Sequence, residues 1–188
     1  MQNGSDQTAE QVVVVLQPVA SQDESFLFQV YASTRADEMA LVQWSEEQRA
    51  DFLWMQFNAQ RQHYLHYYPK AEYSLICQED HQPVGRIIID RSGDEILLMD
   101  IALLPVYRNS GIGTLLVRDI QDEAQAKGFP VHLHVEAFNQ ALHLYERLGF
   151  TTIGEEGIYL KMEWLPSNDE GTQTQPVEKE KINARKTL

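Results

Sequence analysis

A short glycine-containing segment holds the residues best suited to bind a negatively charged ligand. It reads Arg108-Asn109-Ser110-Gly111-Ile112-Gly113 and leads from an apolar run into an expected helix. The first N–H groups of a helix have no partner within the helix, and the helix dipole adds positive charge there. Glycines leave room for a ligand beside the backbone, and Arg108 can add a charge-assisted contact. The segment therefore predicts a loop that binds a diphosphate.

The two best-known glycine-rich phosphate motifs do not match this segment. A dinucleotide-binding fingerprint needs a third glycine within a strand–helix–strand unit, and a P-loop needs Gly-Lys-Ser/Thr. The sequence has neither pattern. Taken alone, Arg-x-x-Gly-x-Gly also fits a helix N-terminus whose glycines only allow tight packing.

Two carboxylates precede the loop and are candidate general bases. Asp100 interrupts an apolar strand, where removal from water would raise its pKa toward the range of a base. A three-residue turn at 92–94, however, pairs residues whose numbers sum to 186 and places Arg86 opposite Asp100. An ion pair there would keep Asp100 ionised and structural. A water chain that ends at Glu95 is the third interpretation.

Other reactive side chains indicate no further chemistry. His132 and His134 share one face of an expected strand, but no third ligand stands nearby in sequence, so we expect no metal site. Cys77 lies within an apolar strand, where a cysteine packs as a small hydrophobic residue.

The composition argues against several classes of partner. The 188 residues carry a formal net charge of −13, whereas a nucleic-acid-binding protein should show a basic patch or stripe. An acidic surface attracts amines or basic peptides, although acidity also simply keeps a protein in solution. No apolar run reaches the roughly 18–20 residues that cross a membrane. The polar N-terminus and the single cysteine predict a cytoplasmic protein.

Periodicity and turn signals predict one layered α/β domain over residues 11–165, between disordered ends at 1–10 and 166–188. The β-branched run at 12–16 predicts a strand covered on both faces. Capping boxes at Ser21-x-x-Glu24 and Ser45-x-x-Gln48 predict helices at 22–33 and 46–67. The other expected strands are 73–78, 84–91, 95–103, 131–135, 151–155 and 158–164, and the other expected helices are 112–127 and 140–148. Because no helix separates the three middle strands, the domain is not doubly wound.

Residues 101–114 and 135–150 together resemble the GNAT N-acyltransferase superfamily. Their separation and the order of the expected elements also match that superfamily over nearly all of residues 11–165. The resemblance implies a mixed, mostly antiparallel sheet of about seven strands, with helices on both faces and a splay between the fourth and fifth strands. It also implies acetyl-CoA as co-substrate and a primary amine, of a small molecule or a protein, as acceptor, in a monomer or homodimer.

The resemblance also assigns residues to the co-substrate. Backbone groups of the strand before the loop should hydrogen-bond the pantetheine arm, at Ile101, Ala102 and Leu103. Groups of the loop and the start of the helix should hold the pyrophosphate, at Arg108, Asn109, Ser110, Gly111, Ile112, Gly113 and Thr114. Asn139 occupies the position of a cofactor-contacting asparagine, although it also fits an N-cap.

Tyr145 occupies the position of a tyrosine that often lies near the thioester sulfur in this superfamily. The implied reaction is direct acyl transfer without a covalent enzyme intermediate, with Tyr145 as the acid toward the thiolate. The alternative is a core tyrosine packed beside Ala141 and Leu148. Several relatives place a glutamate base where this chain has Leu97, so a CoA-binding module without catalysis is the second functional interpretation.

Overall fold

One mixed sheet organises the domain in a computed structural model that describes residues 13–167. Its seven strands lie in the order β1-β2-β3-β4-β5-β7-β6. The strands are β1 (Val14–Pro18), β2 (Glu72–Gln78), β3 (Pro83–Asp90), β4 (Ile96–Leu103), β5 (Val131–Glu136), β6 (Thr151–Glu156) and β7 (Tyr159–Trp164). All neighbours are antiparallel except β4 and β5, which are parallel. This sheet confirms the predicted fold class.

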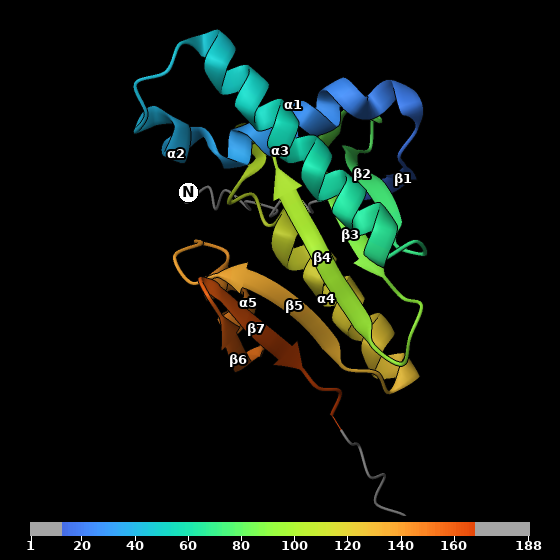
Figure 1. Cartoon of the computed structure of the whole chain (residues 1–188). Helices are drawn as coiled ribbons and strands as arrows, with labels where there is room; N and C mark the ends of the chain where they lie inside the picture. The colour runs from blue at the N-terminus through green and yellow to red at the C-terminus, as the bar shows by residue number, and fades with distance from the viewer. Residues whose placement is uncertain (1–12, 168–188) are drawn as a thin grey trace, which may run out of the picture.

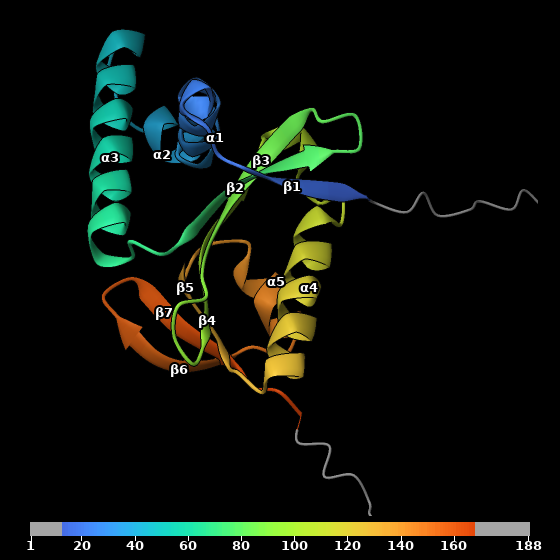
Figure 2. The same ribbon diagram turned by 90° about the vertical axis from the view of Figure 1, so that its right-hand side faces the viewer.

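Helices cover both faces of the sheet, as predicted (Figure 2). One face carries α1 (Glu24–Thr34), α2 (Ala36–Ala40) and α3 (Glu46–Tyr67), and the other carries α4 (Ile112–Lys127) and α5 (Leu142–Arg147). The short helix α2 was not predicted. Two 3₁₀ turns complete the order, η1 (Ser21–Asp23) and η2 (Pro105–Tyr107).

The two predicted capping boxes have different outcomes. At α3 the box is confirmed, because Ser45 Oγ accepts from the Gln48 N–H at 3.2 Å and the Gln48 side chain accepts from the Ser45 N–H at 2.9 Å. The box at Ser21 and Glu24 is wrong. The turn begins one residue earlier, where Asp23 accepts from the Ala20 N–H at 2.8 Å, and α1 begins only at Glu24.

The prediction that the first strand is covered on both faces is also wrong. Strand β1 is an edge strand that pairs only with β2 among the described strands. Val15 and Leu16 are 39% and 41% exposed. A β-branched run favours an extended backbone at an edge as well as in the centre of a sheet, so composition alone could not place it.

The predicted splay lies between β4 and β5, as Figure 1 shows. The two strands pair only over residues 96–98 and 131–133. Strand β4 then runs on to Leu103 and β5 to Glu136 without pairing to each other. The C-terminal half of β4 therefore keeps a free edge on the side of β5.

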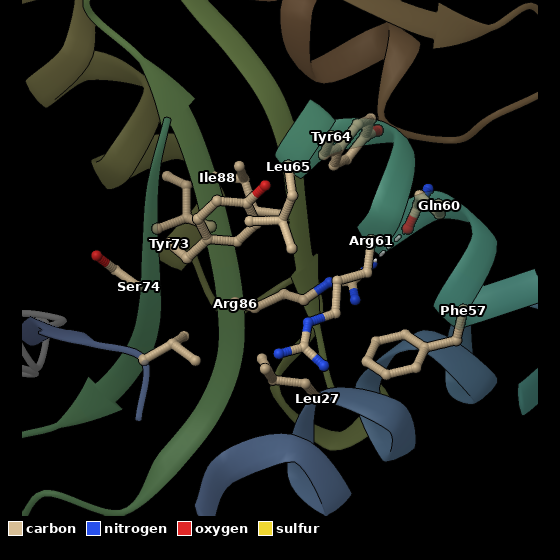
Figure 3. A pocket seen from close by; sticks show the side chains of 12 residues that line it. Leu27, Phe57, Gln60, Arg61, Tyr64, Leu65, Tyr73, Ser74, Arg86 and Ile88 are labelled. Carbon is tan, nitrogen blue, oxygen red and sulfur yellow. Dashed lines mark hydrogen bonds between the residues drawn. The ribbon is translucent and has the colours of Figure 1, made fainter. Parts of the chain in front are cut away.

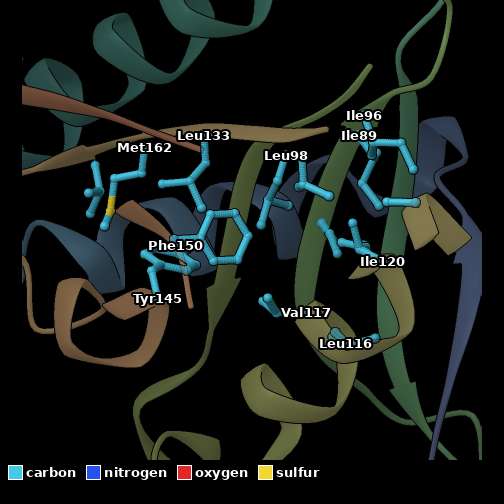
Figure 4. Packing of buried hydrophobic residues seen from close by; sticks show 14 of the residues in the cluster. Ile89, Ile96, Leu98, Leu116, Val117, Ile120, Leu133, Tyr145, Phe150 and Met162 are labelled. Carbon is cyan, nitrogen blue, oxygen red and sulfur yellow. The ribbon is translucent and has the colours of Figure 1, made fainter. Parts of the chain in front are cut away.

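The main core fills the space between the sheet and α4 (Figure 4). Leu116, Val117 and Ile120 of α4 are at most 4% exposed and pack with Leu98 and Leu133 of the sheet. Tyr145 and Phe150 belong to the same cluster. A smaller cluster of Tyr31, Leu53 and Phe57 joins α1 to α3. The two clusters hold the helices that border the splay.

The predicted disordered ends at 1–10 and 166–188 lie outside the described residues, apart from Pro166 and Ser167. Ser167 exchanges two hydrogen bonds with Gln125 of α4, at 2.8 and 2.9 Å. Within residues 13–167, no helix is both long and apolar enough to cross a membrane.

Candidate active site

The free edge of β4 presents backbone groups of two of the three residues predicted to bind pantetheine. The Leu104 N–H donates to the Val84 carbonyl at 2.9 Å, so by antiparallel alternation the groups of Ala102 point to β3. Those of Ile101 and Leu103 point to the splay. The Leu103 carbonyl accepts from Arg108 Nε at 3.1 Å, which leaves the Leu103 N–H and the Ile101 groups facing the splay.

The loop after β4 ends at an uncapped helix N-terminus. Asn109 and Gly111 have positive φ angles of 59° and 91°, and Gly111 is the N-cap of α4 with no side-chain cap hydrogen bond. Ser110 Oγ donates back to the Tyr107 carbonyl at 2.6 Å. The first backbone N–H groups of α4, including that of Ile112, therefore remain available to hydrogen-bond a ligand. This arrangement fits an anionic group such as a pyrophosphate.

The structure bears on two of the residues predicted to bind the pyrophosphate. Arg108 Nη2 donates to the Ser33 carbonyl at 3.0 Å and to Ser33 Oγ at 3.1 Å, so its side chain ties the loop to α1. A Cβ at Gly113 would lie 3.4 Å from Leu144 Cδ2, which is an ordinary van der Waals contact, so packing alone does not require a glycine there. Binding of pyrophosphate by Arg108 and Gly113, and by Thr114 beside them, stays a prediction.

Asn139 caps the turn that leads into α5. Its side-chain oxygen accepts from the Ala141 N–H at 2.9 Å, and Asn139 is exposed. The capping role expected from the sequence is therefore present. The amide NH₂ is not used by this bond, and its contact with a co-substrate stays a prediction.

Tyr145 lies on α5 and is only 5% exposed. Its ring packs edge-to-face on Phe150, with centroids 5.7 Å apart. Burial, and then the negative charge of Asp100, raise the pKa of Tyr145 above the ordinary value of 10. Residues of β4 and α5 thus approach each other across the splay, and the phenol keeps its proton at neutral pH.

Asp100 forms the predicted ion pair with Arg86, although the predicted register is wrong. Arg86 Nε donates to Asp100 Oδ2 at 2.7 Å. Asp100 lies opposite Ile88, whereas Arg86 lies opposite Ala102. The Arg86 side chain is 6% exposed and that of Asp100 is 21% exposed. The carboxylate is therefore paired on one side and reaches solvent on the other.

Glu95 lies away from the splay, just before β4 begins. It contacts His132 Nδ1, and His132 Nε2 lies 2.8 Å from Glu163 Oε1. Five residues of strand separate it from Asp100, which is about 16 Å. Glu95 is thus part of a cluster at the closed end of the β4–β5 pair. Within residues 13–167, no group of three or more histidine, cysteine, aspartate or glutamate side chains is arranged to hold a metal ion.

The C-terminal end of α1 contacts both sides of the splay. These contacts were not predicted from the sequence. Arg108 binds Ser33 from the β4 side. On the β5 side, Arg35 Nη1 donates to Glu136 Oε1 at 3.1 Å, and the Tyr159 hydroxyl donates to the same oxygen at 3.3 Å. These contacts join residues up to 101 positions apart, so no local pattern could have revealed them.

Residues 33–150 match the acetyltransferase (GNAT) family. The chain belongs to this family. A ribosomal protein bS18-alanine N-acetyltransferase of Haemophilus influenzae is 36% identical over 76 residues, which are 40% of this chain and 52% of that protein. The match thus spans about half the length of that relative.

Solved structures of other acetyltransferases have the same fold. A PaiA N-acetyltransferase from Thermoplasma acidophilum in complex with coenzyme A has a TM-score of 0.62 at 18% identity, over 81% of this chain and 99% of that chain. The ribosomal-protein-S18-alanine N-acetyltransferase from Escherichia coli has a TM-score of 0.54 at 20% identity, over 85% of this chain and 98% of that chain.

Proposed function

We propose that this protein transfers the acetyl group of acetyl-CoA directly to a primary amine of a small molecule or a protein. The observation that carries the proposal is the free edge of β4, which leads into the uncapped N-terminus of α4. The strand edge suits the amide groups of a pantetheine arm, and the helix N-terminus suits a pyrophosphate. Family membership supports an acyl-CoA as donor.

The reaction forms a C–N bond and breaks the C–S bond of the thioester, so the amine loses a proton and the thiolate gains one. Tyr145 is the proposed hydrogen-bond donor to the departing sulfur, since its raised pKa keeps the phenol protonated. Asp100 is the proposed acceptor for the ammonium proton, through its solvent-facing side. Its ion pair with Arg86 is made through Oδ2, so Oδ1 is the oxygen proposed to meet the ammonium.

A protein N-terminus is one form of the acceptor, and the Haemophilus influenzae relative favours it by name. A CoA-binding module without catalysis is the second candidate function. It is favoured by Leu97, which stands where several relatives have a glutamate, and by the engagement of Glu95 with His132.

Release of CoA from acetyl-CoA over a panel of primary amines and N-terminal peptides tests the proposal. Turnover that requires the amine supports the acetyltransferase. Tight CoA binding by calorimetry, without turnover for any amine, would instead support the binding module.

A further inference from the structure

A cavity of about 200 Å³ lies between the helices α1 and α3 and the strands β2 and β3 (Figure 3). Its apolar wall includes Leu27 of α1, Phe57 and Leu65 of α3, and Ile88 of β3. We propose that this cavity binds the apolar part of the acceptor, so that the accepted amines carry one compact apolar group and a single positive charge. The inference rests on the proposed function and names the substrate class of the same site.

The size of the cavity limits the group that it can hold. An apolar cavity of roughly 150 Å³ in another protein binds benzene. A cavity of about 200 Å³ therefore accommodates one six-membered ring or a branched aliphatic chain, with a short substituent. A longer chain or a fused ring system would protrude.

One end of the cavity is polar. Arg86 is 5% exposed, and it donates to Asp100 at 2.7 Å and to Gln60 at 3.4 Å. A guanidinium has more N–H donors than these two contacts use. The hydroxyl of Tyr73, which also lines the cavity, is buried without a hydrogen-bond partner among the described residues. A buried donor of this kind favours a ligand that brings a hydrogen-bonding oxygen.

The cavity adjoins the predicted reaction centre through Arg86. Arg86 lines the cavity, and its Nε donates to Asp100 Oδ2 at 2.7 Å. Tyr64 also lines the cavity, and burial raises the pKa of its phenol. The amine of a ligand seated in the cavity would therefore lie on the side of Asp100.

The charges around the cavity discriminate against a second cation. Two guanidinium groups, of Arg86 and Arg61, line it, and each is paired with a single carboxylate, Asp100 and Glu24. A second ammonium placed among them would lose water and meet like charge. The net charge of −13 attracts any cation to the surface. The discrimination between amines with one and with two charges therefore arises when the ligand enters the cavity, and not when it first meets the protein.

Binding of p-cresol, a ring with one hydroxyl and no amine, tests the cavity without any turnover. Calorimetry should show binding to the wild type and to Met55→Trp, a control on the exposed side of α3. Leu65→Trp and Leu27→Trp place a larger ring against the cavity from α3 and from α1 and should weaken binding about tenfold or more. The proposal would be overturned if p-cresol did not bind to the wild type. It would also be overturned if both filled variants bound p-cresol with the affinity of the wild type.

Turnover then connects the cavity to the acceptor. Tyramine should exceed ethylamine in kcat/KM by about tenfold or more, and 1,4-diaminobutane should be poorer than tyramine. Leu65→Trp should reduce the value for tyramine more than that for ethylamine, whereas the surface control Met55→Trp should leave both unchanged. The acceptor assignment is contradicted if kcat/KM is higher for 1,4-diaminobutane than for tyramine. It is also contradicted if p-cresol binds but does not compete with tyramine. If no amine at all releases CoA, the proposed function fails instead, and p-cresol still reports on the cavity.

Discussion

Replacement of Tyr145 by phenylalanine separates a catalytic role from a packing role. The ring packs on Phe150 within the core, and phenylalanine keeps these contacts. No hydrogen bond joins the Tyr145 hydroxyl to another group within residues 13–167. Loss of the hydroxyl should therefore change the free energy of unfolding by less than about 0.5 kcal/mol, because no protein hydrogen bond is lost.

The effect on the rate is expected to be much larger. A hydrogen bond to a charged group contributes roughly 1.5–3 kcal/mol, which corresponds to about 10- to 150-fold in kcat. Complete proton transfer from the hydroxyl would instead correspond to a factor of about 10²–10⁴ in kcat. Because burial and Asp100 raise the pKa of Tyr145, transfer to a thiolate with a pKa of about 8–9 is uphill. We therefore expect Tyr145→Phe to lower kcat by about 10- to 150-fold, with an unchanged Kd for CoA.

Three measurements on one variant decide the question: kcat at saturating amine, Kd for CoA, and Tm. Tyr67→Phe, at a 63% exposed position on α3, is the matched control. Since the raised pKa keeps Tyr145 protonated at neutral pH, the ratio of wild-type to variant kcat should stay constant from about pH 6 to 9. A kcat within threefold of the wild type would remove Tyr145 from the mechanism. A Tm lower by several degrees would mean that the hydroxyl has a structural partner.

Three further sets of substitutions test other parts of the structure. Gly111→Val should strain a residue with φ of 91° and weaken the binding of CoA about tenfold or more, and the binding of pantetheine less. Gly113→Ala should change the binding of both ligands little. Equal weakening of the binding of both ligands by Gly111→Val would refute the phosphate site. Arg35→Met and Glu136→Gln should each cost about 1 kcal/mol of unfolding free energy and be non-additive in the double variant. Burial raises the pKa of Glu123, but its two cationic partners outweigh this and hold the pKa below the ordinary value of a glutamate. Glu123→Gln should thus lower the free energy of unfolding by up to about 1 kcal/mol at pH 7, and denaturant titrations should show this difference shrinking as the pH falls through the pKa of Glu123.

The sequence predicted most of the fold because its signals are local. Gly128, with a left-handed φ of 68°, follows the last residue of α4, where the sequence predicted the helix to end. Gly149, also with a positive φ, directly follows the C-cap of α5. The edge position of β1 and the existence of α2 were not predictable in this way. Both depend on which neighbours are present in space, and β-branched composition or a five-residue helical turn does not encode that.

The candidate site was predicted where a motif fixes the backbone, and missed where side chains meet across elements. The loop from Arg108 to Gly113 lies where expected, but the Arg108 side chain binds Ser33, 75 positions away. The bridge from Arg35 to Glu136 likewise depends on a distant segment, 101 positions away. Spacing in the sequence shows which backbone groups a helix start leaves free, but not which side chain occupies the space in front of them.

The register of β3 and β4 links these misses to the cavity. Asp90 pairs with Leu97 and not with Ile96, which shifts the register by one residue, and Met99 is an extra residue opposite the step from Ile88 to Ile89, which shifts it by one more. Together these shifts place Arg86 opposite Ala102, two residues beyond Asp100. Arg86 still reaches Asp100 because diagonal neighbours are within range of a long side chain. To do so it crosses the face of Tyr31, 5.6 Å from the ring centroid, and approaches Gln60. A directly opposed pair would not need this path, so the diagonal register is consistent with the route of the Arg86 side chain between Asp100, Tyr31 and Gln60.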